Sequence, residues 1–436
     1  MKKIGVVSLG CSKNRIDSEI MMGYLNSAGY AFTNDPADAD VIIVNTCGFI
    51  EAAKQESIDT ILEMAQHKKN NCAALVVTGC LSQRYREELT AELPEVDFML
   101  GVNEYEKLPA LLDTFFNQTG CFDVHAKRVL TTPSHYAYLR IADGCDNRCT
   151  YCAIPFIRGN YVSRDMEEII CEAKYLVSIG VIELIVIAQD TTRYGLDRYG
   201  KRCLPQLLER LDKETDAVWI RLMYTYPDDI DDTLLDVILS SKKIVHYIDI
   251  PIQHADNNIL LRMNRRGTNE SLCRLMDTIR SRDKSFVLRT SFIVGFPGET
   301  QEHFSTLCKF IVDHPFDKVG VFAYSPEDGT KACTFDNAVD ADIAAKRVKK
   351  LMMIQQKVSY ALNERRIGTI VDVLIEGFDS EKSMYYGRSY AEAPEIDGYI
   401  YFRNTNSHAI GSFTRVKITK AREYDLIGED IHEFGQ

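Results

Sequence analysis

Apolar runs and helical patterns alternate along the first 120 residues of the chain. Three short runs, rich in β-branched residues, have the length of buried strands: 4–10, 41–46 and 74–79. Apolar positions at helical spacing fall after each of them, near 14–28, 50–67 and 82–92. This alternation predicts an open parallel sheet that carries helices on both faces.

The alternation resumes at about residue 137 and continues to about residue 325. Strands are predicted at 181–188, 217–226, 245–253, 287–295 and 318–324. Helical patterns lie among them, including 204–213, 231–241, 269–283 and 300–313. A βα series of this length predicts a barrel or partial barrel, in which chemistry takes place at the carboxyl ends of the strands.

The last part of the chain has a different composition. A long helix with a polar face is predicted over 340–366, and residues 368–432 are rich in β-branched and aromatic residues with turn signals. That composition predicts a small all-β barrel. The predicted fold class is therefore α/β, with an amino-terminal open parallel sheet (1–120), a central partial (β/α) barrel (131–362) and a carboxyl-terminal all-β barrel (363–432).

Length and composition are those of an ordinary globular protein. The 436 residues suffice for two or three domains, and a hydrophobic content of 45% supports packed cores. No apolar run reaches the length of a membrane span, and the start MKKIGVVSLGC predicts a first strand, not a signal peptide. We therefore expect a soluble cytoplasmic protein with no membrane partner, whose thirteen cysteines are mostly reduced thiols or metal ligands.

The charge of the chain argues against stable nucleic-acid binding. The formal net charge is −12, and no segment is basic: 1–135, 136–362 and 363–436 carry 12, 30 and 9 Lys+Arg against 18, 32 and 13 Asp+Glu. Nucleic-acid affinity comes mainly from neutralising phosphates. A basic protein is the better electrostatic match.

Each predicted strand of the amino-terminal sheet runs into a cysteine, at Cys11, Cys47 and Cys80. In open α/β sheets ligands bind outside the carboxyl ends of the strands, so three thiols delivered there can converge on one point. One such cysteine alone would be an ordinary buried thiol. Three in succession, each beside a glycine, favour a ligand set.

A second set of cysteines lies in the stretch 143-DGCDNRCTYCAIPFIRGNY-161, where Cys145, Cys149 and Cys152 are spaced C-x3-C-x2-C. Structural zinc sites and cubane iron–sulfur clusters each normally take four protein ligands. For zinc, no CxxC partner follows at finger spacing, and His254 is far away in the sequence. A 4Fe–4S cluster on three thiolates leaves one iron open, and S-adenosylmethionine can occupy it through its amino and carboxylate groups. The spacing therefore favours a cluster, whose missing ligand becomes the active site.

Polar residues crowd at the predicted strand ends of the central barrel. They are Gln189, Asp190, Tyr224, Tyr226, Gln253, His254, Gly295 and Tyr324. A capped strand end or a hydrogen-bonded loop group explains each of them equally well, and only their shared location is informative. The candidates for binding S-adenosylmethionine are Gln189, Asp190, Gln253, Gly295 of the turn 294-VGFPGE-299, and Tyr151.

These motifs carry a family resemblance. C-x3-C-x2-C at the front of a βα barrel, with Tyr151 before the last cysteine, resembles the radical S-adenosylmethionine superfamily. The amino-terminal part resembles a methylthiotransferase domain, and 363–432 is similar to a TRAM domain. The whole chain is thereby identified as a member of the radical S-adenosylmethionine methylthiotransferases. The resemblance implies S-adenosyl-L-methionine and two 4Fe–4S clusters, with Cys145, Cys149 and Cys152 as catalytic ligands of one and Cys11, Cys47 and Cys80 as ligands of the other.

The resemblance also implies a reaction and its partners. One S-adenosylmethionine methylates a sulfur on the amino-terminal cluster, and a second provides a radical that abstracts hydrogen from carbon, which then captures the methylthio group. The stretches LRIADGCDNRCTYCAIPFIRG, YTYPDDI, VGVFAYSPEDGT and GRSYAEAPEIDGYIYF are similar to the branch that modifies the β-carbon of an aspartate of ribosomal protein S12. The alternatives are a tRNA adenosine methylthiotransferase and a non-catalytic iron–sulfur factor that binds RNA or senses redox state. An electron donor such as flavodoxin or ferredoxin is implied.

Charged residues and the remaining cysteines give further expectations. Arg158 could pair with a carboxylate of cofactor or substrate, or it could be a surface arginine. Glu392, Glu395 and Asp397 are candidate contacts for the basic S12, or they form a solvated loop. The cysteines without ligand-like spacing are expected to be buried or incidental thiols: Cys72, Cys121, Cys171, Cys203, Cys273, Cys308 and Cys333.

Overall fold

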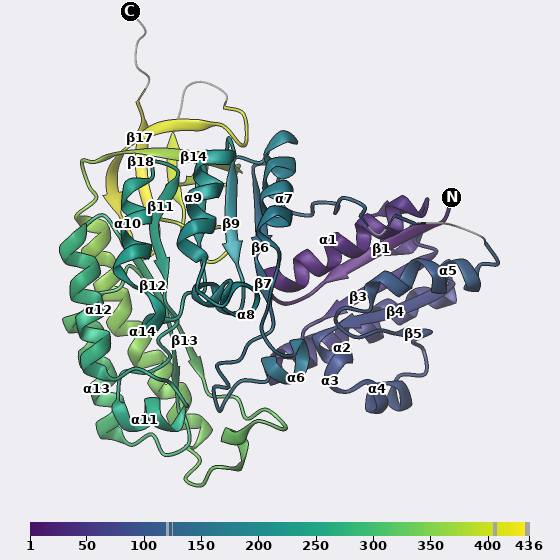
Figure 1. The fold of residues 1–436 in the computed structure, drawn as a ribbon, viewed down its shortest axis with the longest axis horizontal. Coiled ribbons are helices and arrows are strands. Elements are labelled where there is room, and N and C mark those ends of the chain that lie inside the picture. The colour runs from purple at the N-terminus through teal and green to yellow at the C-terminus, as the bar shows by residue number, and fades with distance from the viewer. Residues whose placement is uncertain (119–121, 124, 404–407, 432–436) are drawn as a thin grey trace, which may run out of the picture. The chain divides into compact units, whose positions relative to one another are not determined.

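The computed structural model describes residues 1–118, 122–123, 125–403 and 408–431 (Figure 1). The chain forms two compact units. Unit 1 consists of 1–133, 142–162 and 325–333, and unit 2 consists of 134–141, 163–324 and 334–436. The C-x3-C-x2-C segment thus belongs to the same unit as the amino-terminal sheet. Cys121, expected to be an incidental thiol, lies outside the described residues.

The sheet of unit 1 has five parallel strands in the order β2-β1-β3-β4-β5. The strands are β1 (Lys3–Ser8), β2 (Ala31–Thr33), β3 (Val41–Thr46), β4 (Ala74–Gly79) and β5 (Phe98–Met99). Every residue of β3 is buried because both faces of the sheet are covered. Ile42 lies in one apolar cluster with Ile61 of helix α2 (Glu51–Ala65), whereas Ile43 lies in another with Leu25 of helix α1 (Ser12–Ser27).

The helices of unit 1 follow the predicted pattern, with one interruption. They are α1 (Ser12–Ser27), η1 (Pro36–Asp38), α2 (Glu51–Ala65), η2 (Gln66–Lys69), α3 (Cys80–Arg84), α4 (Arg86–Glu92), η3 (Tyr105–Lys107), α5 (Leu108–Phe115) and α6 (Ile154–Arg158). The helix expected over 82–92 is broken between α3 and α4, where Tyr85 leaves the helical conformation (φ −128°, ψ 36°). The short strands β7 (Ala142–Asp143) and β8 (Val162–Ser163) pair with each other.

Unit 2 contains a six-stranded parallel sheet in the order β13-β12-β11-β10-β9-β6. The strands are β6 (Tyr136–Arg140), β9 (Glu183–Ile187), β10 (Trp219–Leu222), β11 (Ile244–Asp249), β12 (Val287–Val294) and β13 (Lys318–Ala323). The helices between and after them are α7 (Met166–Ser178), η4 (Thr191–Arg193), α8 (Leu196–Tyr199), α9 (Leu204–Glu214), η5 (Pro227–Asp229), α10 (Asp232–Ser240), α11 (Asn257–Arg262), α12 (Asn269–Arg282), α13 (Gln301–Asp313), η6 (Lys331–Thr334, which crosses from unit 1) and α14 (Ala341–Glu364). This is the predicted partial barrel.

A closed barrel of strands β14-β15-β16-β18-β17 completes unit 2. Its strands are β14 (Ile370–Asp379), β15 (Met384–Arg388), β16 (Ile400–Arg403), β17 (Phe413–Ala421) and β18 (Leu426–Asp430). Apolar side chains of β14, β16, β17 and β18 fill its core, with Phe402 and Val416 wholly buried, and Tyr385 of β15 packs against them. The predicted fold class is therefore confirmed. None of the described helices is long and apolar enough to cross a membrane.

Buried ion pairs fasten this barrel to the central sheet within unit 2. Glu183 of β9 accepts hydrogen bonds from Arg221 of β10 (2.7 Å) and Arg388 of β15 (2.8 Å), and none of the three side chains is exposed. Burial acts to raise the pKa of Glu183, but the two guanidinium groups outweigh it and hold the pKa below its ordinary value. The contact also has an apolar part, since the rings of Trp219 and Phe413 meet edge to face at 4.8 Å.

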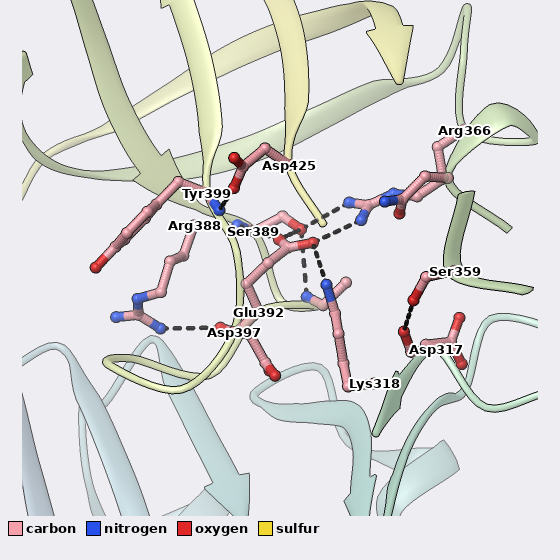
Figure 2. A network of polar contacts seen from close by, with 12 residues as sticks. Asp317, Lys318, Ser359, Arg366, Arg388, Ser389, Glu392, Asp397, Tyr399 and Asp425 are labelled. Carbon is pink, nitrogen blue, oxygen red and sulfur yellow. Dashed lines mark hydrogen bonds and ion pairs between the residues drawn. The ribbon is translucent and has the colours of Figure 1, made fainter. Parts of the chain in front are cut away.

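The expectation that Glu392, Glu395 and Asp397 are contacts for a basic partner, or a solvated loop, is wrong for Glu392 and Asp397, whose side chains are buried. Figure 2 shows Glu392 turned inward, where its carboxylate binds Arg366 at 2.6 Å and lies 3.8 Å from Lys318. Asp397 accepts a hydrogen bond from the hydroxyl of Tyr247 at 2.7 Å, and its side chain is also buried. Glu395 is exposed but accepts hydrogen bonds from two tyrosines of β6. These carboxylates hold the barrel to the sheet.

Candidate iron–sulfur site

The three amino-terminal cysteines lie at one edge of the unit 1 sheet. Cys11 precedes helix α1, Cys47 follows β3 directly, and Cys80 begins α3 immediately after β4. Because β1, β3 and β4 are neighbours and parallel, their carboxyl ends lie together. The backbone of Cys47 is held by Ser57 of α2, which accepts from its N–H at 3.0 Å and donates to its carbonyl at 2.9 Å.

Glycines allow the three cysteine turns to touch. A Cβ atom added to Gly10 would lie 2.8 Å from Cβ and 2.9 Å from Sγ of Cys47. A Cβ atom added to Gly48 would lie 2.7 Å from Cα of Leu81, the residue after Cys80. No side chain fits at either place without displacing the neighbouring turn. Gly10 and Gly48 therefore allow the turns of Cys11, Cys47 and Cys80 to pack closely together.

Asn14 of helix α1 contacts all three cysteine turns and was not identified from the sequence. Its side-chain amide donates to the carbonyls of Leu9 (3.1 Å), which directly follows β1, and Thr46 (2.8 Å), which ends β3. Its side-chain carbonyl accepts from the thiol of Cys80 at 3.2 Å. The available signal was a helix whose polar residues Asn14, Asp17 and Ser18 recur at helical spacing, all of them buried in the structure.

Burial favours the protonated form of two of these thiols, Cys47 and Cys80. Burial raises the pKa of Cys47, and it raises the pKa of Cys80 to about 12. The charge of Arg158 opposes both shifts, whereas the charge of Cys11 adds to them. Thiolates gathered in such a place are stabilised by a bound metal, which releases their protons on binding.

Hydrogen bonds close the segment that carries Cys145, Cys149 and Cys152. The N–H of Cys145 donates to the carbonyl of Gly159 at 3.2 Å, and the N–H of Cys152 donates to the carbonyl of Cys149 at 3.1 Å. The N–H of Tyr161 donates to the Asp146 carboxylate at 3.1 Å. All three cysteines and Tyr151 are partly exposed. The segment is thus a closed loop that presents its thiols at a partly open surface.

The structure corrects the alternative that Arg158 is a surface arginine, because its side chain is buried and pairs with carboxylates of the chain itself. Its side chain is 1% exposed and forms ion pairs with Asp17 at 2.7 Å and Asp143 at 3.0 Å. It also donates to the side-chain carbonyl of Asn14 at 2.8 Å and lies 3.9 Å from Sγ of Cys80. Burial acts to lower the pKa of Arg158, but the two carboxylates hold the pKa well above its ordinary value, so the charge is permanent.

The donor chemistry of both cysteine sets fits iron–sulfur clusters. All twelve cysteines in the described residues are thiols, and the two sets of three supply soft sulfur ligands without a fourth cysteine nearby in sequence. In the described part of the chain no group of three or more His, Cys, Asp or Glu side chains surrounds the position of a single metal ion. A four-iron cluster does not require that arrangement, because each of its thiolates binds a different iron.

Strained backbone marks the strand ends of unit 2. Three residues just beyond successive strands have positive φ: Tyr224 (58°), Gln253 (76°) and Gly295 (74°). Such conformations cost energy for residues other than glycine and cluster at functional sites. Gln253 also continues the sheet, since its N–H donates to Ser291 and its carbonyl accepts from Ile293, both at 2.8 Å. Its backbone is therefore fixed on both sides in this costly conformation.

Local structural roles account for some, but not all, of the other residues predicted to bind S-adenosylmethionine. Asp190 caps helix η4 by accepting from the N–H (3.1 Å) and hydroxyl (2.5 Å) of Thr192. Gly295 donates its N–H to Glu299, and an added Cβ atom would lie 2.5 Å from Cβ of Ala344 on α14. Gln189 is partly exposed directly beside Asp190. A local structural role thus accounts for the contacts of Asp190 and for the glycine at 295.

Glu299 and His254 form a buried polar pair that the sequence did not single out as a pair. Both side chains are wholly buried, with His254 Nε2 3.8 Å from Glu299 Oε1. Neither of these two atoms has a hydrogen-bond partner among the described residues. The other carboxylate oxygen of Glu299 accepts from the N–H of Phe296 at 3.1 Å and lies 3.4 Å from Arg347. Glu299 thereby fixes the 294–299 turn.

Comparison with known families matches three parts of the chain. Residues 3–101 match the uncharacterized protein family UPF0004, residues 139–311 match the radical SAM superfamily, and residues 367–431 match the TRAM domain. Solved structures show the same fold at low sequence identity. The radical S-adenosylmethionine methyltransferase TsrM from Kitasatospora setae gives a TM-score of 0.56 at 12% identity, over 82% of this chain and 89% of that chain. The cobalamin-dependent enzyme OxsB gives 0.52 at 12% identity, over 82% and 56%.

Curated relatives match the chain over its whole length. One from Clostridium tetani is 50% identical over 98% of this chain and 97% of its own, and one from Acetivibrio thermocellus is 45% identical over 99% of each. Both are named ribosomal protein uS12 methylthiotransferase RimO. The fold, the two cysteine sets and the three family matches define a radical S-adenosylmethionine methylthiotransferase. Within that class, the chain belongs to the ribosomal protein uS12 methylthiotransferase RimO family.

Proposed function

We propose that this enzyme adds a methylthio group to the β-carbon of an aspartate of ribosomal protein uS12, with S-adenosyl-L-methionine and two 4Fe–4S clusters. The observation that carries the proposal is that two sets of three cysteines lie in one compact unit, bridged by Arg158 and Asn14. The sequence identity of 45–50% to uS12 methylthiotransferases over the full length supports the substrate. It disfavours both a tRNA substrate and a non-catalytic sensor.

The roles of the cysteines follow from their positions. Cys145, Cys149 and Cys152 would hold the cluster that binds S-adenosylmethionine, while Cys11, Cys47 and Cys80 would hold the second cluster at the sheet edge. When bound, these groups supply radical chemistry and the methylthio group, which no protein side chain can provide for an unactivated carbon. The chain itself orients the thiols through Asn14 and the glycine turns, and it keeps water from Cys47 and Cys80 by burial.

Further assignments belong to the same proposal. Gln189, Asp190, Gln253, Gly295 and Tyr151 are the proposed contacts for S-adenosylmethionine. The strained conformation of Gln253 supports its assignment, and the local hydrogen bonds of Asp190 make it a positioning residue for its neighbours. The proposed domains are a methylthiotransferase domain (1–120), a radical SAM core (131–362) and a TRAM domain (363–432). The enzyme would act in the cytoplasm with a reductant such as flavodoxin or ferredoxin.

Two triple variants test the division of labour between the cysteine sets. Reconstituted without oxygen, the wild-type chain should bind about eight irons. The variant C145A/C149A/C152A should keep roughly half of that iron and lose cleavage of S-adenosylmethionine. The variant C11A/C47A/C80A should also keep about half of the iron and still cleave S-adenosylmethionine, but it should transfer no methylthio group. Iron analysis, 5′-deoxyadenosine formation and mass spectrometry of uS12 measure the three quantities.

Controls at cysteines outside both sets make the test specific. Replacing Cys171 of helix α7 and Cys273 of helix α12, which both belong to unit 2, with alanine should change neither iron content nor product. Methylthio transfer by C11A/C47A/C80A would contradict the two-cluster assignment. Modification of tRNA adenosine but not uS12 by the wild-type enzyme would overturn the substrate.

A further inference from the structure

One side chain physically joins the two cysteine sets. Arg158 lies six residues after Cys152, at the end of helix α6, yet its guanidinium contacts Asn14 and Asp17 of helix α1 and lies 3.9 Å from Sγ of Cys80. Helix α6 itself packs against the same place, since Ala153 and Ile157 share an apolar cluster with Cys80. The residue that reaches the sheet edge is thus carried by the C-x3-C-x2-C segment.

The charges around Cys80 have opposite electrostatic effects on it. The guanidinium of Arg158 reaches Sγ of Cys80 at 3.9 Å, and the Asp17 carboxylate binds the same guanidinium nitrogen at 2.7 Å. A positive and a negative charge therefore lie next to a cysteine that is only 5% exposed. In a site shielded from water these charges act through a low dielectric and are screened little by salt. Arg158 therefore makes the electrostatic potential at the sulfur ligands more positive, and Asp17 makes it more negative.

We propose that Arg158 is a positioning residue that supplies a fixed positive charge to the amino-terminal cluster and thereby raises its reduction potential. The inference rests on the proposed function, which assigns a cluster to Cys11, Cys47 and Cys80. Cluster potentials depend on net charge, on hydrogen bonds to the sulfur ligands and on solvent exposure. A cation 3.9 Å from a ligand sulfur stabilises the reduced, more negative form of the cluster. The sulfur-carrying cluster is then tuned by a residue of the radical segment.

Ion pairing explains why arginine suits this position. One terminal nitrogen of its planar guanidinium binds Asp143. The other nitrogen contacts Asp17, Asn14 and Sγ of Cys80. Lysine carries the same charge on a single nitrogen and cannot make both sets of contacts at once. The substitution R158K should therefore keep the positive charge near Cys80 but only some of the contacts that hold it in place.

The test measures the midpoint potential of the amino-terminal cluster in the reconstituted full chain. The variant C145A/C149A/C152A identifies which of the two midpoints belongs to this cluster. Compared with wild type, R158Q should shift that midpoint to more negative potential, and R158K should return it most of the way. D17N should shift it in the opposite direction, because it removes a negative charge without removing the arginine. A loss of anchoring alone predicts no such reversal of sign.

A second buried ion pair on helix α1 serves as a matched control. Arg128 forms an equally buried ion pair with Glu19 of α1 at 2.7 Å, and the Glu19 carboxylate also accepts from the N–H of Thr131 at 2.9 Å. R128Q should leave the midpoint unchanged. Midpoints of R158Q and D17N that equal the wild-type value, with iron retained, would overturn the inference. If R158Q binds no iron, D17N alone decides by the sign of its shift. Absence of iron from C145A/C149A/C152A would instead refute the proposed second cluster.

Discussion

Two glycines enclose the C-x3-C-x2-C segment with the same backbone requirement but different surroundings. Gly144 and Gly159 both have positive φ, at 74° and 73°. A Cβ atom added to Gly144 would lie 2.0 Å from the carbonyl oxygen of Asn160, whereas one added to Gly159 would meet nothing within 4 Å. The first glycine therefore satisfies a conformational and a steric requirement, and the second satisfies only the conformational one.

We expect G144A to lose the radical cluster and G159A to keep it. Alanine at positive φ costs roughly 1–2 kcal/mol, which both variants share. G144A must in addition push the carbonyl of Asn160 aside, and this disturbs the adjacent hydrogen bond from Cys145 to Gly159 that closes the loop. Iron content should fall by about half in G144A, with loss of S-adenosylmethionine cleavage, and should stay close to wild type in G159A. Equal iron content in the two variants would contradict the steric argument.

At the scale of elements, strand β15 and the segment after it meet helix α14 and strand β13 through one buried carboxylate. Glu392 accepts from Arg366 at 2.6 Å, from the N–H of Ser389 at 3.0 Å and from its hydroxyl at 2.6 Å. Burial acts to raise the pKa of Glu392, but Arg366 and Lys318 outweigh it and lower the pKa to about 2. Since the ordinary value is 4.5, ionisation of this group is linked to the folded state.

This linkage predicts a pH-dependent difference between wild type and E392Q. A carboxyl whose pKa is lowered on folding contributes stability above its unfolded pKa, and that contribution is lost as pH falls through the folded pKa. The wild-type advantage in unfolding free energy should be about 3 kcal/mol near neutral pH. It should shrink steadily below pH 4.5 toward zero near pH 2. Urea unfolding of both proteins across this range measures it.

The exposed neighbour supplies the control for this measurement. E395Q removes a carboxylate that accepts from Tyr136 at 3.1 Å and Tyr138 at 3.2 Å. Its effect should stay below about 1 kcal/mol, as is usual for exposed polar contacts. A constant difference between wild type and E392Q from pH 7 to pH 3 would show that Glu392 is not held ionised by its neighbours.

Local periodicity was enough to predict most elements but not the direction of their charged side chains. The apolar runs of β3 and β4 and the spacing of α12 and α13 are properties of adjacent residues, and the structure follows them. The orientation of Glu392 depends on Arg366, and that of Arg158 depends on Asp17, a residue 141 positions away. Counting charges in a segment gives its net sign but not which charges are already paired inside the fold. For this reason the acidic docking patch was predicted wrongly.

At the scale of the molecule, unit 1 is assembled from three separate stretches of chain. The third, 325–333, binds both of the others: Glu327 pairs with Arg84 at 2.8 Å and Lys54 at 3.3 Å, and the N–H of Ala332 donates to the carbonyl of Thr150 at 2.8 Å. Sequence patterns do not predict this arrangement, because each contact joins residues far apart in the chain. The positions of the cysteine-bearing segments therefore depend on contacts between distant parts of the chain and on any cluster that the cysteines bind.

Cluster removal should loosen these cysteine segments while leaving the carboxyl-terminal barrel intact. Without iron, the thiols of both sets lose their metal ligation, and metal binding is linked to local folding. Amide hydrogen exchange should therefore become faster in the iron-free protein at 8–14, 45–50, 79–84 and 143–160. The strands β14 to β18 have a closed hydrogen-bonded barrel and an apolar core, so their exchange should not change. Exchange by mass spectrometry on both forms resolves the segments, and C11A/C47A/C80A should reproduce the first three accelerations even when the radical cluster is loaded. Unchanged protection at all four segments would count against clusters being held there.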